Sequence, residues 1–491
     1  MKLVPSFLLL LAAAGLRAEP GVVALPGRSP IVTFRVVFEA GAALDPAGKE
    51  GLASLTAAML SQGGSREMSY KQIVDAMFPM ASSVAAQVDK EMTVFSAATH
   101  ADNLEAFYRI FRGMLLDPGW RPEDLARLRD DSINFLRVSL RDNNDEELGK
   151  EVLYNAIYAG TPYGHHNAGT VSSLKSITLD DLKSFYRRNY AQSNVTIGLA
   201  GGYPPEFLER MKKDFARLPA QAQAAAPEVK PVPVKGIHVT MVEKPTRSVA
   251  YSFGFPIEVR RGHRDFPALL VAQSYFGQHR VSGGRLFERM RQARGLNYGD
   301  YAYIEYFPRG MYQFEPDPNL ARRSQIFQIW IRPVEPPTAH FALRLAFYEL
   351  DRFIREGISQ EDFERTRAFC SKYVNLLMKT KRAELGYAID SRYYGIPDYA
   401  AYIRASLAKL TRDDVNRAIR THLRTGDLHL AVVGRDLEAL RAKLLANERS
   451  PMTYNSPKPD EILTEDKIVE TWTIGFKLEN VKIVPVNTVF E

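Results

Sequence analysis

Residues 283–298 hold the side chains best suited to chemistry in this chain. Phe287 and Met290 among charged residues predict a short helix, and Gly295 fits the left-handed position that ends a helix. Arg291 then lies on the helix, and Tyr298 stands at the start of a predicted strand. By spacing alone, the simpler interpretation is a cation on a helix surface and a half-buried strand aromatic.

A second stretch, residues 51–64, predicts a short helix of small residues that follows a strand and a glycine turn. Ser54 and Ser61 are the nucleophile types within it. No histidine lies near either serine in the sequence to act as a general base. The stretch is therefore interpreted as a core helix.

Two further residue types deserve the same test, histidine and cysteine. His165 and His166 are adjacent, and neighbours on a strand point to opposite faces, so they are poorly placed to bind one metal. We interpret them as loop residues. Cys370 is the single cysteine, so the chain has no internal disulfide, and its helical surroundings predict a buried thiol.

The stretch at residues 51–64 resembles the start of the insulinase/pitrilysin family of zinc peptidases, in particular the mitochondrial-processing-peptidase-like branch. In that family the helix reads Gly-Leu-Ala-His-x-x-Glu-His-Met, an inverted zinc motif. Here Ser54 and Ala58 stand at the two histidine positions and Ala57 at the glutamate position. The third ligand of the family, a glutamate roughly 75 residues further on, falls at residues 133–136, which hold no acid. The resemblance thus implies a member without a metal site and without a cofactor in this chain.

The resemblance also covers residues 283–298, where the family carries Arg-Leu-Phe, an arginine and then Gly-Leu-x-Tyr. That arginine and tyrosine match Arg291 and Tyr298. In the family the pair faces the zinc across two halves or two subunits, so the guanidinium would hold a substrate carbonyl and the phenol would donate to the oxyanion. The family also binds extended peptide at a sheet edge. Residues 89–91 are predicted to flank such an edge strand.

Composition and charge are those of a globular protein rather than of a nucleic-acid-binding one. The formal charge is +7, and removal of residues 1–18 takes away Lys2 and Arg17 and leaves +5, scattered among acids. Residues 1–18 resemble a cleavable secretory signal, which predicts a periplasmic or secreted protein. No later stretch approaches the roughly 20 apolar residues of a membrane span.

An internal repeat divides the chain into two homologous halves. The segments that begin at Thr178 and Thr411 match at an offset of 233 residues, and the glycine-ended strands at Gly201 and Gly434 match at the same offset. A third match, residues 122–125 with 360–363, is offset by 238. The predicted divisions are an N-terminal peptidase-like domain at 19–218, a linker at 219–235, a C-terminal peptidase-like domain at 236–445 and an extension at 446–491.

Each half mixes strand-like and helix-like patterns. Residues 31–38 and 92–98 are rich in β-branched and aromatic residues, as in strands. Capping boxes begin helices at Thr178, Ser359 and Thr411. We therefore expect an α+β fold, with two similar halves in a clamshell, each a mixed or antiparallel sheet packed with helices.

Three functions remain open from the sequence. The first is a non-catalytic subunit of a heterodimeric zinc peptidase, in which an intact partner of the same family holds the zinc and this chain supplies Arg291, Tyr298 and half of the chamber for a peptide substrate. The second is a structural or peptide-binding protein without a catalytic role, like the core subunits of respiratory complexes. The third, a solitary peptidase, would require zinc bound to this chain.

Overall fold

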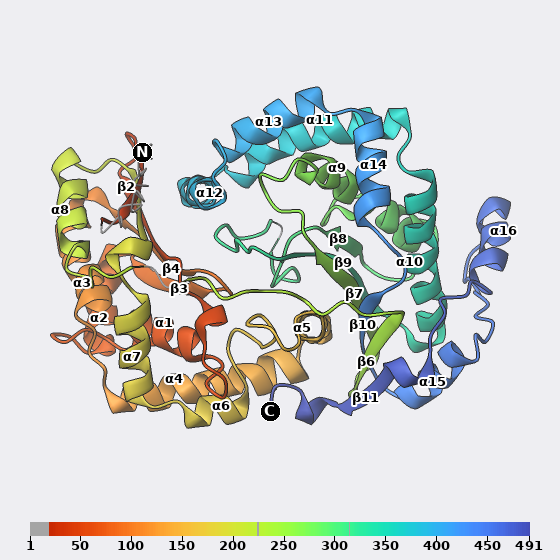
Figure 1. Cartoon of the computed structure of the whole chain (residues 1–491), viewed down its shortest axis with the longest axis horizontal. Helices are drawn as coiled ribbons and strands as arrows, with labels where there is room; N and C mark the ends of the chain where they lie inside the picture. Colours follow the sequence, from red (N-terminus) through yellow and green to blue (C-terminus); the bar gives the residue numbers. More distant parts are fainter. Residues whose placement is uncertain (1–18, 223–224, 314) are drawn as a thin grey trace, which may run out of the picture.

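The computed structural model describes residues 19–222, 225–313 and 315–491. A β-sheet stands at the centre of each half, and helices surround both sheets (Figure 1). This confirms the predicted α+β fold. The predicted secretory signal at residues 1–18 lies outside the described residues. Within the described part of the chain, no helix is long and apolar enough to cross a membrane.

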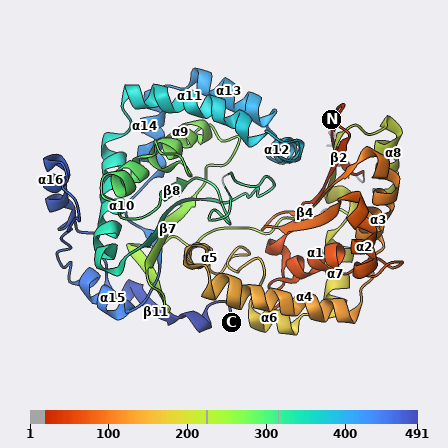
Figure 2. The same ribbon diagram turned by 180° about the vertical axis from the view of Figure 1, so that it is seen from behind.

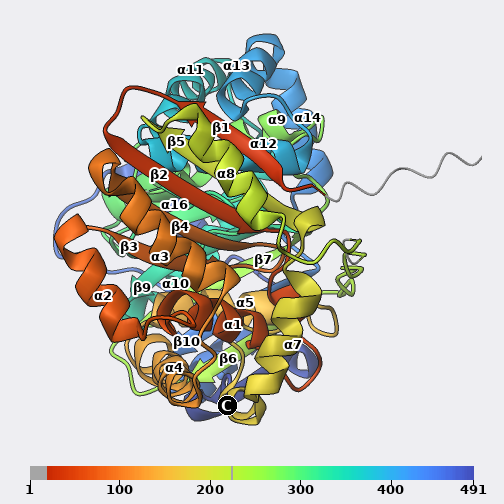
Figure 3. The ribbon, with the colours of Figure 1, turned by 90° about the vertical axis from the view of Figure 1, so that its left-hand side faces the viewer.

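The sheet of the first half, called sheet 1, has the strand order β1-β5-β2-β4-β3. The strand β1 runs parallel to β5, and the other neighbours are antiparallel. Its strands are β1 (Gly21–Pro26), β2 (Ile31–Phe38), β3 (Ser83–Val88), β4 (Thr93–His100) and β5 (Val195–Gly201). The outer face is covered by helices, among them α3 and α8, whose aromatic rings pack around Phe34 (Figure 3).

The sheet of the second half, called sheet 2, has the order β11-β6-β10-β7-β9-β8. Its strands are β6 (Ile237–Glu243), β7 (Val249–Ile257), β8 (Asp300–Tyr303), β9 (Gln325–Val334), β10 (Leu428–Gly434) and β11 (Val481–Pro485). The order β6-β10-β7-β9-β8 repeats the order of sheet 1, and β11 adds a parallel strand beyond β6. Phe253 of β7 stacks on Phe347 of α10 at 4.6 Å between ring centroids, on the outer face.

The helices fall into two corresponding sets. The first half holds α1 (Leu52–Gln62), α2 (Tyr70–Met77), α3 (Leu104–Leu116), α4 (Pro122–Asn134), α5 (Asp145–Ile157), α6 (Val171–Ser176), α7 (Leu179–Asn189) and α8 (Pro205–Phe215). The second half holds α9 (Phe266–Gly277), α10 (Pro336–Glu356), α11 (Gln360–Leu377), α12 (Lys381–Tyr394), α13 (Tyr399–Lys409), α14 (Arg412–His422), α15 (Leu437–Leu445) and α16 (Asp460–Val469). Short π-helical turns follow α4 (η4, Phe135–Asp142) and α9 (η6, Phe287–Gln292).

One helix from each half packs against the sheet of the other half. The helix α5 lies on the inner face of sheet 2, and α12 lies on the inner face of sheet 1 (Figures 1 and 2). Two glycines permit this close packing. A Cβ at Gly198 of β5 would meet Ile389 of α12 at 2.9 Å, and a Cβ at Gly149 of α5 would meet Ser252 of β7 at 3.3 Å. The halves are therefore interlocked by packing and not only tethered by the linker.

Local predictions hold at several element boundaries. The helices α7 and α14 begin at capping boxes of Thr178 and Thr411, and Ser359 caps α11. Gly295 has a φ of 70° and closes the turn that carries Arg291. Cys370 is buried in α11, and burial raises the pKa of its thiol to about 11. In the predicted linker, the described residues 219–222 and 225–235 form no helix or strand.

Candidate functional site

The helix α1 occupies the position of the metal-binding helix and is held by packing and hydrogen bonds. Asp45 accepts hydrogen bonds from the backbone N–H groups of Gly51 and Ala53, both at 2.7 Å, and so caps the helix. The Ser54 hydroxyl donates to the carbonyl of Asn167 at 2.5 Å. Ala57 is buried and Ala58 is half-buried. Ser54, Ala57 and Ala58 offer neither an imidazole nor a carboxylate at the motif positions to coordinate zinc.

The position of the third metal ligand is equally altered. Residues 133–136 lie where α4 passes into η4, and Phe135 there is 42% exposed. Its ring centroid lies 6.0 Å from that of His166. Among the described residues, no group of three or more histidine, cysteine, aspartate or glutamate side chains is placed to hold a metal. The residues at these positions therefore do not fit the zinc ion that the intact motif of the family binds.

His165 and His166 lie in a loop, as predicted, and turn to different partners. The Nε2 atom of His165 is 3.3 Å from Oδ2 of Asp45. His166 accepts a hydrogen bond at Nδ1 from the Ala168 N–H, and its Nε2 is 3.8 Å from Oε2 of Glu151. Burial lowers the pKa of His166 to about 3, so its ring is neutral at ordinary pH.

Arg291 and Tyr298 form a pair on the second half, in which Tyr298 is exposed and Arg291 is half-buried. The Arg291 guanidinium lies 5.1 Å from the centre of the Tyr298 ring and donates to the Tyr298 carbonyl at 3.2 Å. Tyr298 is 75% exposed, so the alternative of a half-buried strand aromatic is wrong, and it precedes β8 by two residues. In the described part of the chain, none of the hydrogen bonds or ring contacts of the pair reaches α1. Their role in catalysis stays a prediction.

The strand β3 is an edge strand of sheet 1, at the end of the sheet opposite β1, and residues 89–91 form the turn that follows it, as predicted. It pairs with β4 on one side, and Ser83, Ala85 and Ala86 are exposed. The Asn167 side chain donates to the Val88 carbonyl at 3.3 Å and to Asp89 at 3.0 Å. Asn167 thus connects the end of the edge strand with α1, because its own carbonyl binds Ser54.

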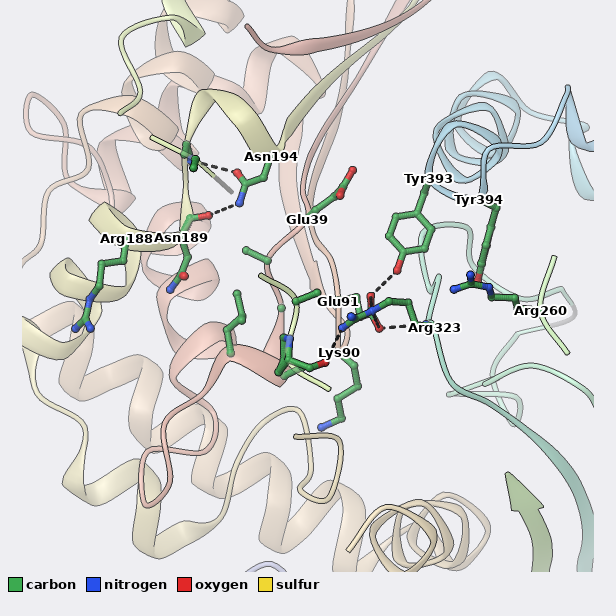
Figure 4. A pocket seen from close by; sticks show the side chains of 18 residues that line it. Glu39, Lys90, Glu91, Arg188, Asn189, Asn194, Arg260, Arg323, Tyr393 and Tyr394 are labelled. Carbon is green, nitrogen blue, oxygen red and sulfur yellow. Dashed lines mark hydrogen bonds and ion pairs between the residues drawn. The ribbon is translucent and has the colours of Figure 1, made fainter. Parts of the chain in front are cut away.

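A cavity of about 280 Å³ lies between the two halves, under the linker (Figure 4). Glu91 stands at its wall, where it accepts hydrogen bonds from the Tyr393 hydroxyl and from Nε of Arg323, the latter at 2.9 Å (Figure 4). The cavity contains cationic, anionic and apolar side chains. Its polar and aromatic lining is Glu39, Lys90, Glu91, Arg188, Asn189, Asn194, Arg260, Arg323, Tyr393 and Tyr394.

A network of buried charges on α5 was not predicted. Lys150 donates to Glu147 at 2.6 Å, and the Tyr306 hydroxyl donates to Glu151 at 3.1 Å. Burial, with a smaller contribution from Glu147, raises the pKa of Glu151 to about 7. Burial and the nearby Arg322 lower the pKa of Lys90 to about 7. The run of acids and a lysine at residues 145–151 is the sequence feature that forms this network. By itself, such a run is typical of an exposed helix.

The remaining candidate nucleophiles are engaged in structure. The Ser61 hydroxyl donates to the Ala57 carbonyl at 2.9 Å within α1, and the Cys370 thiol is buried. What the described residues offer is therefore an exposed edge strand, an Arg–Tyr pair with an exposed tyrosine and an interlocked frame. An edge strand of this kind can pair with an extended peptide through its main chain.

Comparison with known proteins agrees with this fold. The family model described as insulinase (peptidase family M16) matches residues 22–171, and the one described as peptidase M16 inactive domain matches residues 176–369. The non-peptidase homolog YmxG of Helicobacter pylori is 21% identical over 82% of this chain and 89% of its own length.

Two solved structures share the fold. A peptidase M16 inactive domain from Pseudomonas fluorescens superposes with a TM-score of 0.73 and 23% identity, over 85% of this chain and 96% of its own. The periplasmic protease PqqL of Escherichia coli gives a TM-score of 0.67 and 14% identity, over 94% of this chain and 50% of its own. The chain belongs to the insulinase (M16) family and is a member that lacks the zinc motif.

Proposed function

We propose that this chain is the non-catalytic subunit of a two-chain zinc peptidase of the M16 family. The observation that carries the proposal is the combination of a motif helix without ligands, at Ser54, Ala57 and Ala58, with an Arg291–Tyr298 pair whose tyrosine remains exposed. A chain that kept only its own fold would have no need of that pair. The zinc then belongs to an intact partner of the same family.

In this proposal Arg291 and Tyr298 act on a peptide that the partner's zinc site hydrolyses. The guanidinium binds a substrate carbonyl and the phenol donates to the oxyanion of the tetrahedral intermediate. Two features support action in trans. The pair is open to a second chain, and its contacts in the described residues are with each other and with Phe287 rather than with α1.

The edge strand β3 supplies the peptide-binding surface in the same proposal. An extended peptide can pair with the free side of an edge strand through its main chain. Ala85 and Ala86 of this strand are exposed and carry small side chains. The site of action is the bacterial envelope, because residues 1–18 resemble a secretory signal and PqqL, a structural neighbour, is a periplasmic protease.

A structural or peptide-binding protein without a catalytic role is the second candidate. The observation that favours it is the set of buried ion pairs between the two halves, such as Arg332 with Glu146, which hold the chain in one arrangement. The relative YmxG is also called a non-peptidase homolog. In this alternative Arg291 and Tyr298 are ordinary surface residues.

A mixing experiment tests the proposal. A candidate partner, an M16 chain with the intact zinc motif from the same organism, is purified alone, and hydrolysis of unfolded peptides is measured with and without this chain. The proposal expects little activity from either chain alone and strong activity from the mixture. Full activity of the partner alone would contradict it and would favour the structural alternative.

A further inference from the structure

The end of the chain crosses from the second half to the first. The strand β11 pairs in parallel with β6, from Val481 opposite Val239 to Pro485 opposite Glu243. A short turn then carries the chain away from sheet 2, and residues 489–491 end against the first half, beside α6 (Figure 1). The extension is therefore attached to both halves.

The last residues are bound by a defined set of partners. The Phe490 carbonyl accepts a hydrogen bond from the Val171 N–H at 3.0 Å, and the Glu491 carbonyl accepts one from the Ser172 N–H at 2.8 Å. The Glu491 side chain receives hydrogen bonds from Arg137 and from Arg141. Its carboxylate is therefore clamped by two guanidinium groups, which are the strong partners of a carboxylate.

Arg141 shows that this clamp is built into the fold. Its side chain is 6% exposed, which is low for a cation at the end of a π-helical turn. It donates from Nη1 to the Asn487 carbonyl at 2.8 Å and from Nη2 to Glu491 at 2.9 Å. A buried guanidinium requires such partners, because burial without them is costly.

Phe490 is the apolar anchor of the same segment. It is 8% exposed, and its ring centroid lies 5.2 Å from that of His166. Its φ of 57° lies in the left-handed region, which a large side chain enters only where the surroundings hold it. An unconstrained segment would leave that conformation. The contacts of Phe490 therefore hold its backbone in place.

The partners of the tail also support the peptide-binding edge. His166 precedes Asn167, whose carbonyl binds Ser54 of α1 and whose side chain binds Val88 and Asp89 at the end of β3. In the same segment, the Ser173 hydroxyl donates to the Glu50 carbonyl just before α1. Residues 486–491 therefore contact the segment 166–173, which is hydrogen-bonded both to α1 and its start and to the end of β3.

We propose that residues 486–491 are a C-terminal latch. The latch groove consists of Arg137, Arg141, His166, Val171 and Ser172, and its ligand is an extended segment in which a phenylalanine is followed by a glutamate. The chain's own end fills the groove, joins the two halves and fixes the position of β3 relative to sheet 2. This inference does not depend on the proposed function, since it concerns the chain alone.

The first test separates the latch from the rest of the chain. Residues 486–491 are deleted, and a fluorescently labelled synthetic peptide of that sequence is titrated into the shortened and the full-length chain. We expect saturable binding to the shortened chain, at least about tenfold weaker binding to the full-length chain, and at least about tenfold weaker binding of a peptide with Phe490→Ala. Equal binding to both chains, or no binding to a folded shortened chain, would overturn the proposal.

The second test uses the full-length chain, so it applies even if the shortened chain fails to fold. Amide hydrogen exchange of residues 165–173 is measured in the wild type, in Phe490→Ala and in Leu478→Ala. Leu478 lies in the same extension but is 61% exposed and outside the groove, which makes it the matched control. We expect exchange at residues 165–173 to rise at least about tenfold in Phe490→Ala alone. Unchanged exchange in Phe490→Ala, or the same increase in both variants, would refute the latch.

Discussion

Asp89 and Arg322 form a buried ion pair that joins the tips of the two equivalent β-hairpins. Nε of Arg322 lies 2.8 Å from Oδ2 of Asp89, and both side chains are almost completely buried. Asp89 follows β3 and Arg322 precedes β9, and the two are 322 − 89 = 233 residues apart, which is the offset of the internal repeat. Corresponding positions of the two halves therefore meet with opposite charges, an arrangement that two identical halves could not make.

The first prediction concerns the stability that this pair contributes. Arg322→Met leaves the Asp89 carboxylate buried without its cation, so the free energy of unfolding should fall by about 3–5 kcal/mol. The measurement is denaturant-induced unfolding. In the double variant with Asp89→Asn the loss should be smaller than the sum of the two single losses.

Lys71→Met, which removes the exposed ion pair with Asp75, is the control and should cost less than about 1 kcal/mol. Equal losses in Arg322→Met and Lys71→Met would contradict the prediction.

The second prediction concerns the pH dependence of stability. Burial raises the pKa of Glu151 from 4.5 to about 7. Between these values the folded chain keeps a proton that the unfolded chain releases, so this group's contribution to stability is complete below pH 4.5 and is lost as the pH rises through about 7. Glu151→Gln should abolish this pH-dependent loss of stability. At about 1.4 kcal/mol per pKa unit, the loss is on the order of 3 kcal/mol.

The measurement is the thermal unfolding midpoint of wild type and Glu151→Gln at pH 5 and at pH 8. The unfolding midpoint of the variant should rise relative to that of the wild type between pH 5 and pH 8. The reason is that the amide at position 151 still accepts the hydrogen bond from Tyr306 and carries no charge. A constant difference between the two proteins across this range would show that Glu151 does not titrate there.

The third prediction concerns Tyr298 in the mixed peptidase. Tyr298→Phe removes the phenol donor, so kcat of the mixture should fall about 10²–10³-fold, with little change in the association of the two chains. Tyr312→Phe is the matched control, since Tyr312 is another tyrosine that is 69% exposed. Peptide hydrolysis and co-migration on a sizing column are the readouts. If both variants keep wild-type kcat, Tyr298 has no part in the reaction.

The fourth prediction concerns the motif helix. Ser54→His, Ala57→Glu and Ala58→His together restore the family's helix sequence, and two imidazoles one turn apart can share a metal. This variant should bind zinc weakly in equilibrium dialysis, because residues 133–136 still supply no third ligand. Ser61→His, which adds one histidine to the same helix, is the control and should bind none. Failure of the triple variant to bind more zinc than the control would mean that the backbone of α1 has also diverged.

Much of the fold could be predicted from local chemistry. A hydroxyl followed three residues later by an acid begins α7 at Thr178 and α14 at Thr411, because each pair closes its own hydrogen bonds. The strand predicted at residues 31–38 is β2, with the same boundaries. The repeat at an offset of 233 anticipated two similar sheets. These features depend on neighbours in the sequence, so the sequence alone specifies them.

The interlocking of the halves could not be predicted in the same way. The local sequence of α5 and of α12 does not show which sheet each helix packs against. The charges of Glu147, Lys150 and Glu151 are typical of a solvated helix, and they are buried here because residues 305–323 bring Tyr306 and Arg322 over them. Partners that lie more than 150 residues away leave no periodic trace in the local sequence.

We expect this polypeptide to bind no zinc of its own. The most direct measurement is the zinc content of purified residues 19–491, which are saturated with zinc, dialysed and assayed by elemental analysis alongside an intact M16 peptidase. The account predicts far less than one zinc per chain here and about one in the intact enzyme. One tightly bound zinc per chain, lost on Ser54→Ala, would contradict it.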